Sequence, residues 1–318
     1  MTTLAIHGGA GALPRSEMTP ERAAEYHTAL RAALDAGQRC LTGGASSLDA
    51  VEAAVIWLED CPLFNAGRGS SFNREGRIEM EASVMEGATR KAGAATLLRS
   101  VRNPVQLARR VMEKTPHVTL GGEAAERFAI AEGLRREPED YFFTQYRWDA
   151  MLKLRGTDRT ALSEDVVVPA AADSPAAMST VGAVARDAAG HLAAATSSGG
   201  TTNKYSGRIG QACVVGAGVY AHDATCAVSC TGQGEAFMRG VIAYDVAALM
   251  EYRGLELAAA VDVAIQQRLP GRGGLVAVDG RGNLALSFNT EGMYRGWVDH
   301  RGNVCTAIYD SLQMWPSP

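Results

Sequence analysis

The sequence has no strong excess of one charge and no long apolar run. Its 31 Lys and Arg residues face 35 Asp and Glu, for a net charge of −4, whereas a nucleic-acid-binding protein usually carries a basic excess. No segment reaches the ~18 uninterrupted apolar residues that a membrane helix needs. Residues 1–7 lack the basic stretch that opens a signal peptide. We therefore expect a cytoplasmic protein with no nucleic-acid partner and no membrane partner.

Cysteines and cofactor motifs are also sparse. The six cysteines are scattered at positions 40, 61, 213, 226, 230 and 305, and no second Cys or His pair stands at zinc spacing. In a long chain this pattern favours buried thiols over a disulfide framework. No P-loop, G-x-S-x-G or H-E-x-x-H motif is present, and residues 7–11 lack the spacing of a dinucleotide loop. We expect no cofactor for catalysis.

What is present is a globular composition rich in glycine. Apolar residues make up 47% and charged residues 21%, close to the average for folded domains. The 35 glycines include pairs at 8–9, 199–200 and 273–274. Such pairs indicate tight loops around a site rather than a flexible linker.

Helix signals dominate the first half of the chain. Thr19-Pro20 is an N-cap followed by proline at the first helical position, and the helix that it opens should end near Gly43. Ser46 or Ser47 should cap a second helix over 48–58. Strands are expected within 70–98, and further helices over about 103–114 and 122–133.

The second half is predicted to be mostly strands. An Ala/Pro/Ser-rich stretch over about 149–179 indicates a mobile connector. Residues 182–200 form a hairpin pattern that aligns without a gap on 274–292, with eight of 19 positions identical. A strand pair over 214–229 and helices over about 233–252 and 255–268 lie between these hairpins. The order predicts an α+β fold with two antiparallel sheets and helices on their outer faces.

Thr180 stands where the connector ends and a strand begins. A threonine in that place is ordinarily a good strand former. Alternatively, cleavage of the Ser179–Thr180 bond would make Thr180 a new N-terminus. Its α-amine, with a pKa of roughly 7.7 to 8.0, could then act as the base for its own hydroxyl. That chemistry needs neither histidine nor metal.

Three other segments could complete such a site. The hydroxyl-rich run 196–204 should fold back so that residues near 197–198 lie opposite Thr180, although such a run is also typical of a solvated loop. Residues 230–235, at a strand-to-helix junction, could bind a developing oxyanion or simply cap a helix. Arg208 could be a surface arginine or a clamp for a substrate carboxylate.

Together the motifs resemble the plant-type asparaginase/isoaspartyl peptidase family of N-terminal-nucleophile (Ntn) hydrolases. The resemblance covers nearly the whole chain and is weakest in 135–178. The segments that carry it are His7-Gly-Gly-Ala-Gly11, Leu63-Phe-Asn-Ala-Gly67, Ser179-Thr-Val-Gly-Ala-Val184, Ala195-Thr-Ser-Ser-Gly-Gly200, Cys230-Thr-Gly-Gln-Gly-Glu235 and Phe288-Asn-Thr-Glu-Gly-Met-Tyr-Arg295.

The resemblance implies a four-layer αββα sandwich and a precursor that cleaves itself before Thr180. One domain, 1–318, would become an α subunit of residues 1–179 and a β subunit of residues 180–318, assembled as a dimer of αβ heterodimers. The implied activity is hydrolysis of β-aspartyl (isoaspartyl) dipeptides, and of L-asparagine to L-aspartate and ammonia. The substrates would therefore be small molecules.

The resemblance also implies the catalytic roles. Thr180 would be the nucleophile and its α-amine the base. Ser198 stands where the family usually has a threonine that hydrogen-bonds the nucleophile. Thr231 and the N–H of Gly232 would form the oxyanion hole, and Asn65 would steady the active-site amine.

Substrate and ion binding are implied in the same way. Arg208 would hold the substrate's α-carboxylate, and the carbonyl of Gly234 its ammonium. A loop would offer backbone carbonyls to a structural sodium ion; its residues are Leu58, Glu59, Cys61, Phe64, Ala66 and Arg68.

Two residues depart from the family pattern. Ser179 stands where the family typically has glycine before the nucleophile. Gln211 stands where the family has an aspartate that pairs with the substrate's ammonium; glutamine keeps an acceptor oxygen but loses the charge. These departures keep one alternative open, a silent or substrate-shifted homologue on the same fold. A glycosylasparaginase-type amidase of the same family is a further alternative.

Overall fold

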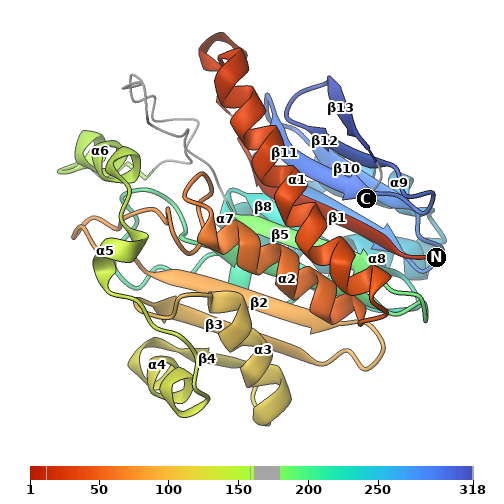
Figure 1. Ribbon diagram of the computed structural model, residues 1–318, viewed down its shortest axis with the longest axis horizontal. Helices are drawn as coiled ribbons and strands as arrows, with labels where there is room; N and C mark the ends of the chain where they lie inside the picture. The colour runs from red at the N-terminus through yellow and green to blue at the C-terminus, as the bar shows by residue number, and fades with distance from the viewer. Residues whose placement is uncertain (12, 158, 161–179, 317–318) are drawn as a thin grey trace.

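The computed structural model describes residues 1–11, 13–157, 159–160 and 180–316. Ser179 and most of the predicted connector therefore lie outside the described residues. Figure 1 shows helices α1, α2 and α3 lying across the strands, with the N-terminal strand β1 among strands from the C-terminal half.

The first two helices begin where the sequence predicts. Helix α1 (Pro20–Thr42) starts after Thr19, whose side chain accepts the backbone N–H of Arg22. Helix α2 (Ser47–Asp60) starts after Ser46, which forms a capping box with Asp49. Each cap satisfies backbone donors that a helix start leaves unpaired.

A nine-stranded sheet forms the larger β layer, in the order β13-β12-β11-β1-β5-β6-β2-β3-β4. The strands are β1 (Thr3–Ala10), β2 (Met80–Glu86), β3 (Ala92–Leu98), β4 (Thr119–Gly121), β5 (Val181–Arg186), β6 (Leu192–Ser198), β11 (Met293–Val298), β12 (Val304–Ala307) and β13 (Leu312–Trp315). Thr180 immediately precedes β5, which lies between β1 and β6 near the middle of this sheet.

The prediction of purely antiparallel sheets is wrong at one edge. Strand β4 pairs in parallel with β3, whereas the other ladders of the sheet are antiparallel. Helix α3 (Pro104–Lys114) lies between β3 and β4 in the chain and packs on β3. A helical crossover of this kind returns the chain in the same direction, and the sequence pattern did not show the short strand that follows it.

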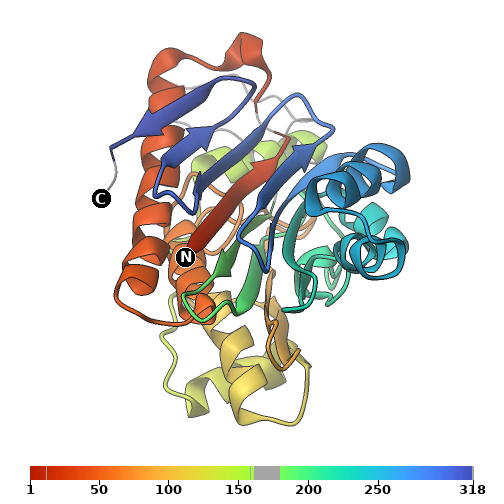
Figure 2. The same ribbon diagram turned by 90° about the vertical axis from the view of Figure 1, so that its right-hand side faces the viewer.

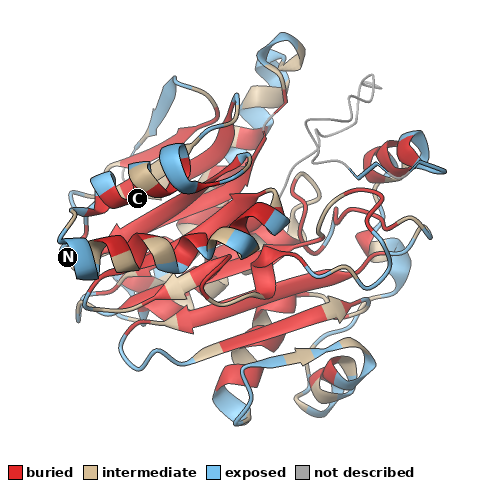
Figure 3. Ribbon diagram, turned by 180° about the vertical axis from the view of Figure 1, so that it is seen from behind, coloured by how far each residue is buried: buried red, intermediate tan, exposed pale blue. Residues whose placement is uncertain are grey.

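A four-stranded antiparallel sheet packs against the first, in the order β10-β9-β8-β7. Its strands are β7 (Val219–Ala221), β8 (Cys226–Gly232), β9 (Gly273–Asp279) and β10 (Leu284–Phe288). Figure 2 shows the orange helices of the N-terminal part on one side of the strands and the blue-green helices α8 and α9 on the other. Buried residues from both sheets, among them Val184, Ala194 and Val276, form an apolar core between them. Figure 3 shows this burial along the strands, with exposed positions mainly on helices and loops.

The predicted mobile connector begins too early. Residues 149–154 belong to helix α6 (Gln145–Leu154), in which Tyr146, Ala150, Met151 and Leu154 are buried. This apolar helical face is interrupted by charged residues, so the sequence pattern looked irregular. Within the rest of the predicted connector, residues 158 and 161–179 lie outside the described residues.

The helices of the second half are also more broken than predicted. The single helix expected over 233–252 is divided into α7 (Gly234–Gly240) and α8 (Ile242–Arg253), because Val241 adopts a left-handed conformation with φ of 49°. The next helix is α9 (Leu257–Asp262), continued by a π-helical turn η4 (Val263–Arg268). The remaining helices of the described residues are α4 (Gly122–Ala131), α5 (Glu139–Phe142), η1 (Arg15–Glu17) and η3 (Gln211–Cys213).

Two further properties concern the whole of the described chain. All six cysteines are free thiols, of which Cys213, Cys226, Cys230 and Cys305 are buried. None of the helices in the described ranges is both long enough and apolar enough to cross a membrane.

Candidate active site

The hydroxyl of Thr180 meets that of Ser198, as the hairpin pattern predicts. The β5–β6 register pairs Val181 with Ser197, which sets the next residues, Thr180 and Ser198, side by side. Thr180 Oγ1 donates to Ser198 Oγ over 3.1 Å, and Ser198 Oγ also accepts the N–H of Gly200 at 2.9 Å. Both side chains are buried. The threonine hydroxyl is therefore held in one orientation before any ligand binds.

Gln211 reaches the same hydroxyl from the turn η3. Its Nε2 donates to Thr180 Oγ1 over 3.0 Å, and the side chain is only 2% exposed. Its Oε1 points the other way and lies 2.6 Å from where a Cβ on Gly234 would stand. The amide thus bridges Thr180 and the start of α7. An aspartate at this position could accept but could not donate to Thr180 when ionised.

Arg208 lies beside this group and is held by Glu235. Arg208 Nε and Nη2 each make a 3.0 Å hydrogen bond to the Glu235 carboxylate, a bidentate pair that fixes the guanidinium plane. Burial acts to lower the pKa of Arg208, but the bonds to Glu235 outweigh it and raise the pKa. Nη2 is also close to Gly234, at 2.6 Å from a Cβ built there. Arg208, Gln211 and Gly234 therefore converge.

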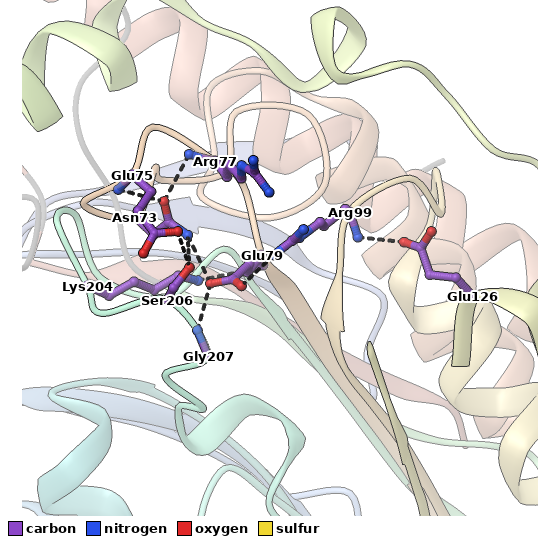
Figure 4. Close-up of polar contacts among 9 residues, drawn as sticks. All are labelled: Asn73, Glu75, Arg77, Glu79, Arg99, Glu126, Lys204, Ser206 and Gly207. Atoms are coloured by element: carbon purple, nitrogen blue, oxygen red, sulfur yellow. Dashed lines mark hydrogen bonds and ion pairs between the residues drawn. The ribbon is translucent and has the colours of Figure 1, made fainter. Parts of the chain in front are cut away.

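A polar network holds the loop that leads to Arg208 (Figure 4). Glu79 Oε2 accepts the side-chain amide of Asn73 and the backbone N–H of Gly207, both at 3.1 Å, and Glu79 Oε1 accepts from Arg99. Burial opposes ionisation here, but these hydrogen bonds lower the pKa of Glu79. The carboxylate thus anchors Gly207 directly before Arg208.

Lys204 lies in the same loop, and its side chain is buried. Its Nζ donates to the carbonyl oxygens of Glu79 at 2.5 Å and of Gly199 at 2.8 Å. Burial lowers the pKa of Lys204 to about 8. The contact with Gly199 ties this loop to the residue that follows Ser198.

Thr231 and Gly232 form the end of β8. Thr231 Oγ1 accepts the backbone N–H of Ala10 over 3.1 Å, so its oxygen is positioned by the first strand. Gly232 has φ of +143°, a conformation that strongly favours glycine, and a Cβ there would stand 2.5 Å from the carbonyl oxygen of Arg272. Ser229, two residues before Thr231 on the same face, lies beside Gly182 of β5.

His7 contacts the backbone of Thr180, the candidate nucleophile. The sequence alone assigned His7 no role. Its Nδ1 lies 3.0 Å from the carbonyl oxygen of Thr180, and its Nε2 lies 2.8 Å from Ser229 Oγ. A carbonyl can only accept, so Nδ1 carries the proton. Burial lowers the pKa of His7 to about 3, so the ring is neutral at ordinary pH. The signal available in the sequence was its place in the His7–Gly11 motif.

Asn65 lies next to the end of β6. Its Nδ2 donates to the carbonyl of Gly200 over 2.7 Å, and its Oδ1 accepts the N–H of Ser71 over 2.8 Å. Its backbone carbonyl accepts the N–H of Gly199. Asn65 thus fixes the residues that follow Ser198.

The loop predicted to hold sodium folds back on the end of α2. The carbonyl of Glu59 accepts the N–H of Arg68 at 2.7 Å, and that of Cys61 accepts the N–H of Phe64. A Cβ on Gly69 would stand 2.6 Å from the carbonyl oxygen of Pro62 and 2.7 Å from that of Phe64. Backbone carbonyls gathered in a tight loop are the kind of donor that alkali cations take in proteins. Of the six predicted carbonyls, that of Phe64 lies in such a group, beside that of Pro62.

Comparison with known proteins places the chain among enzymes that hydrolyse amide bonds. Residues 1–308 match the asparaginase family. The isoaspartyl peptidase of Salmonella typhimurium is 50% identical over 309 residues, which cover 96% of this chain and 98% of that protein. The isoaspartyl peptidase of Escherichia coli is also 50% identical, over 96% of this chain and 95% of its own length. A probable isoaspartyl peptidase/L-asparaginase of Arabidopsis thaliana is 42% identical, with 96% and 98% covered.

The fold, the site and these matches define a hydrolase. The chain belongs to the asparaginase family, and the match extends over nearly its whole length.

Proposed function

We propose that this protein is a self-cleaving threonine amidohydrolase that hydrolyses β-aspartyl dipeptides and L-asparagine. The observation that carries the proposal is the environment of Thr180. Its hydroxyl is buried, donates to Ser198 Oγ and accepts from Gln211 Nε2, directly before the first residue of β5. The names of relatives that match 96% of the chain support the substrate class.

In the mature enzyme Thr180 would be the N-terminal residue. Cleavage of the Ser179–Thr180 bond frees the α-amine, which takes the hydroxyl proton as Oγ1 attacks the substrate's β-carbonyl carbon. The attack places a negative charge on the carbonyl oxygen, which the Thr231 hydroxyl and the Gly232 N–H would stabilise. The protonated amine then gives its proton to the departing nitrogen. Water hydrolyses the remaining ester, releasing aspartate and restoring Thr180.

Substrate orientation would come from the group around Arg208. Its guanidinium, held by Glu235, would bind the α-carboxylate, and the Gly234 carbonyl and Gln211 would face the α-ammonium. Ser198 would hold the hydroxyl of the nucleophile, and Asn65 would steady its amine. Gln211 would thus contact both the hydroxyl of Thr180 and the bound substrate.

The proposal extends to the architecture. The two packed sheets with helices on their outer faces fit the four-layer αββα sandwich of Ntn hydrolases. Cleavage would yield chains 1–179 and 180–318, which we propose to assemble as a dimer of αβ heterodimers in the cytoplasm. Leu58, Glu59, Cys61, Phe64, Ala66 and Arg68 would hold a structural sodium ion through backbone carbonyls. When bound, that ion would stiffen the loop that carries Asn65.

A substrate-shifted homologue is the second candidate, favoured by Gln211 in place of the family's aspartate. A panel of substrates separates the two. We expect release of L-aspartate from β-aspartyl-leucine and from L-asparagine, and none from α-aspartyl-leucine. Thr180→Ala should release none from any of them. Hydrolysis confined to substrates without an α-amino group would favour the substrate-shifted homologue, and undiminished hydrolysis by Thr180→Ala would overturn the threonine mechanism.

A further inference from the structure

Glu81 is a buried carboxylate beside the candidate active site that neither the motifs nor the mechanism uses. It lies on β2 opposite Ser198 of β6 in the antiparallel ladder, so the two side chains share one face of the sheet. Glu81 is 3% exposed. It therefore lies within the same layer as the hydroxyl of Thr180.

One oxygen of this carboxylate is fixed and the other has no protein partner. Oε2 accepts the N–H of Gly210 over 2.8 Å, and the thiol of Cys213 lies 3.7 Å from it. Oε1 is buried without a hydrogen-bond partner among the described residues. A buried carboxylate oxygen left unpaired costs free energy, so such an atom is expected to meet a donor at some stage of function.

The unpaired oxygen points toward the residues proposed to bind substrate. A Cβ on Gly210 would stand 2.6 Å from Glu81 Oε1 and 2.5 Å from Arg208 Nη1. Arg208 uses Nε and Nη2 for Glu235. Arg208 Nη1 and Glu81 Oε1 therefore both lie against Gly210, a positive donor close to a negative acceptor.

The neighbouring acid on the same segment shows what a purely structural carboxylate looks like here. Glu79 has partners on both oxygens, Arg99 on Oε1 and both Asn73 and Gly207 on Oε2 (Figure 4). Glu81 has partners on Oε2 alone. The difference leaves Glu81 Oε1 as a buried acceptor that has no partner among the described residues and lies close to Arg208.

An α-amino acid carries a carboxylate and an ammonium group on one carbon, so it matches a cation and an anion placed close together. Its carboxylate would meet Arg208, and its ammonium group would need an acceptor close by. Gln211 supplies no charge, and its Nε2 is engaged with Thr180. We propose that Glu81 binds the α-ammonium group of the substrate's aspartyl part and thereby supplies the negative charge that Gln211 lacks. This inference rests on the proposed function for the identity of the substrate.

The test is a comparison of two ligands that differ in the amino group. L-aspartate and succinate are titrated calorimetrically into the mature protein. We expect the wild type to prefer L-aspartate by about 10-fold or more, and Glu81→Gln to lower that ratio about 10-fold, the difference between a charged and a neutral hydrogen bond. Glu86→Gln removes a carboxylate from the far end of β2 and should leave the ratio unchanged.

Two further variants distinguish a direct contact between Glu81 and the ligand from a long-range effect of its charge. Glu81→Asp keeps the charge but withdraws it by one methylene group, so a direct contact predicts a lowered ratio and a long-range field predicts an unchanged one. Glu81→Gln combined with Gln211→Asp returns a charge to the pocket and should regain most of the preference. The rescue would show that position 81 acts on the ligand and not on the fold.

Three results would overturn the inference. The first is an unchanged ratio of the two affinities in Glu81→Gln, and the second is an equal loss of affinity for L-aspartate and succinate in that variant, which would indicate a structural role. The third is a wild type that binds L-aspartate no better than succinate. Failure of the proposed function looks different. The wild type would then hydrolyse no β-aspartyl substrate, whatever the ratio of the two binding constants.

Discussion

His7 and Thr180, 173 positions apart in the chain, are joined by a 3.0 Å hydrogen bond between His7 Nδ1 and the carbonyl oxygen of Thr180. The bond connects strand β1, in the proposed α subunit (residues 1–179), with the first residue of the proposed β subunit (residues 180–318). His7 Nε2 meets Ser229 Oγ, so one neutral ring connects β1, the start of β5 and β8. The backbone of the proposed nucleophile is therefore held by a residue close to the N-terminus of the chain.

The buried His7 should make stability fall with acidification. Its pKa is about 3 in the native protein against 6.5 for the free side chain, so the unfolded state binds the proton first. The contribution of His7 is present above pH 6.5 and decreases as the pH falls toward 3, by about 1.4 kcal/mol per pH unit. We expect the difference in unfolding free energy between wild type and His7→Gln to shrink accordingly between pH 6 and 4. A pH-independent difference would contradict the neutral buried ring.

Glu59 should have the opposite pH dependence. Burial raises its pKa to about 8, although hydrogen bonds from Ser197 and Val105 act against the shift. The native state therefore keeps a proton that the unfolded state loses above pH 4.5, and this contribution to stability is lost as the pH rises toward 8. The unfolding free energy of wild type relative to Glu59→Gln should fall by about 1.4 kcal/mol per pH unit between pH 5 and 7.5. Denaturant titrations of both proteins measure it; a flat difference would mean that Glu59 is ionised in the fold.

The Thr231 hydroxyl is positioned by the N–H of Ala10, and we expect its loss to affect the chemical step. Thr231→Ala should lower kcat about 10²- to 10³-fold with little change in KM, since an oxyanion donor acts in the transition state. Steady-state kinetics with β-aspartyl-leucine gives both constants. Thr225→Ala, at the turn before β8, is the control and should have wild-type kinetics. A Thr231→Ala enzyme with unchanged kcat would remove Thr231 from the oxyanion hole.

The bidentate pair between Arg208 and Glu235 predicts sensitivity to a change that conserves charge. Arg208→Lys keeps the positive charge but cannot pair with Glu235 through two parallel bonds. KM for β-aspartyl-leucine should rise roughly 10-fold or more. Arg127→Lys, on the exposed face of α4, should have no such effect. A normal KM for Arg208→Lys would mean that the geometry of the guanidinium plays no part in binding.

Local signals predicted local structure well. Thr19-Pro20 and Ser46 start their helices because a cap depends on neighbours within four residues. The hairpin predicted over 182–200 could be recognised in the same way, and with it the contact between Thr180 and Ser198. The break at Val241 could not, because its left-handed backbone is not a preference of valine.

Contacts between distant segments were the part that the sequence did not show. His7, Glu235 and Glu81 reach the site from β1, α7 and β2, and no spacing rule connects them with Thr180. The residue pattern alone made Arg208 and residues 230–235 candidates, and the resemblance to a family gave Arg208 and Thr231 their roles. It did not supply the hydrogen bond from Gln211 to Thr180, because there the chain departs from the family pattern.

The central claim is that Thr180 becomes an N-terminus by self-cleavage, and the chain ends of the purified protein test it most directly. Intact mass and N-terminal sequencing are measured on wild type and on Thr180→Ala, both purified without added protease. The account predicts two wild-type chains, the smaller beginning at Thr180, and a single chain of 318 residues for Thr180→Ala. A wild-type protein that hydrolyses β-aspartyl-leucine as one intact chain, or a Thr180→Ala protein cut at the same bond, would contradict it.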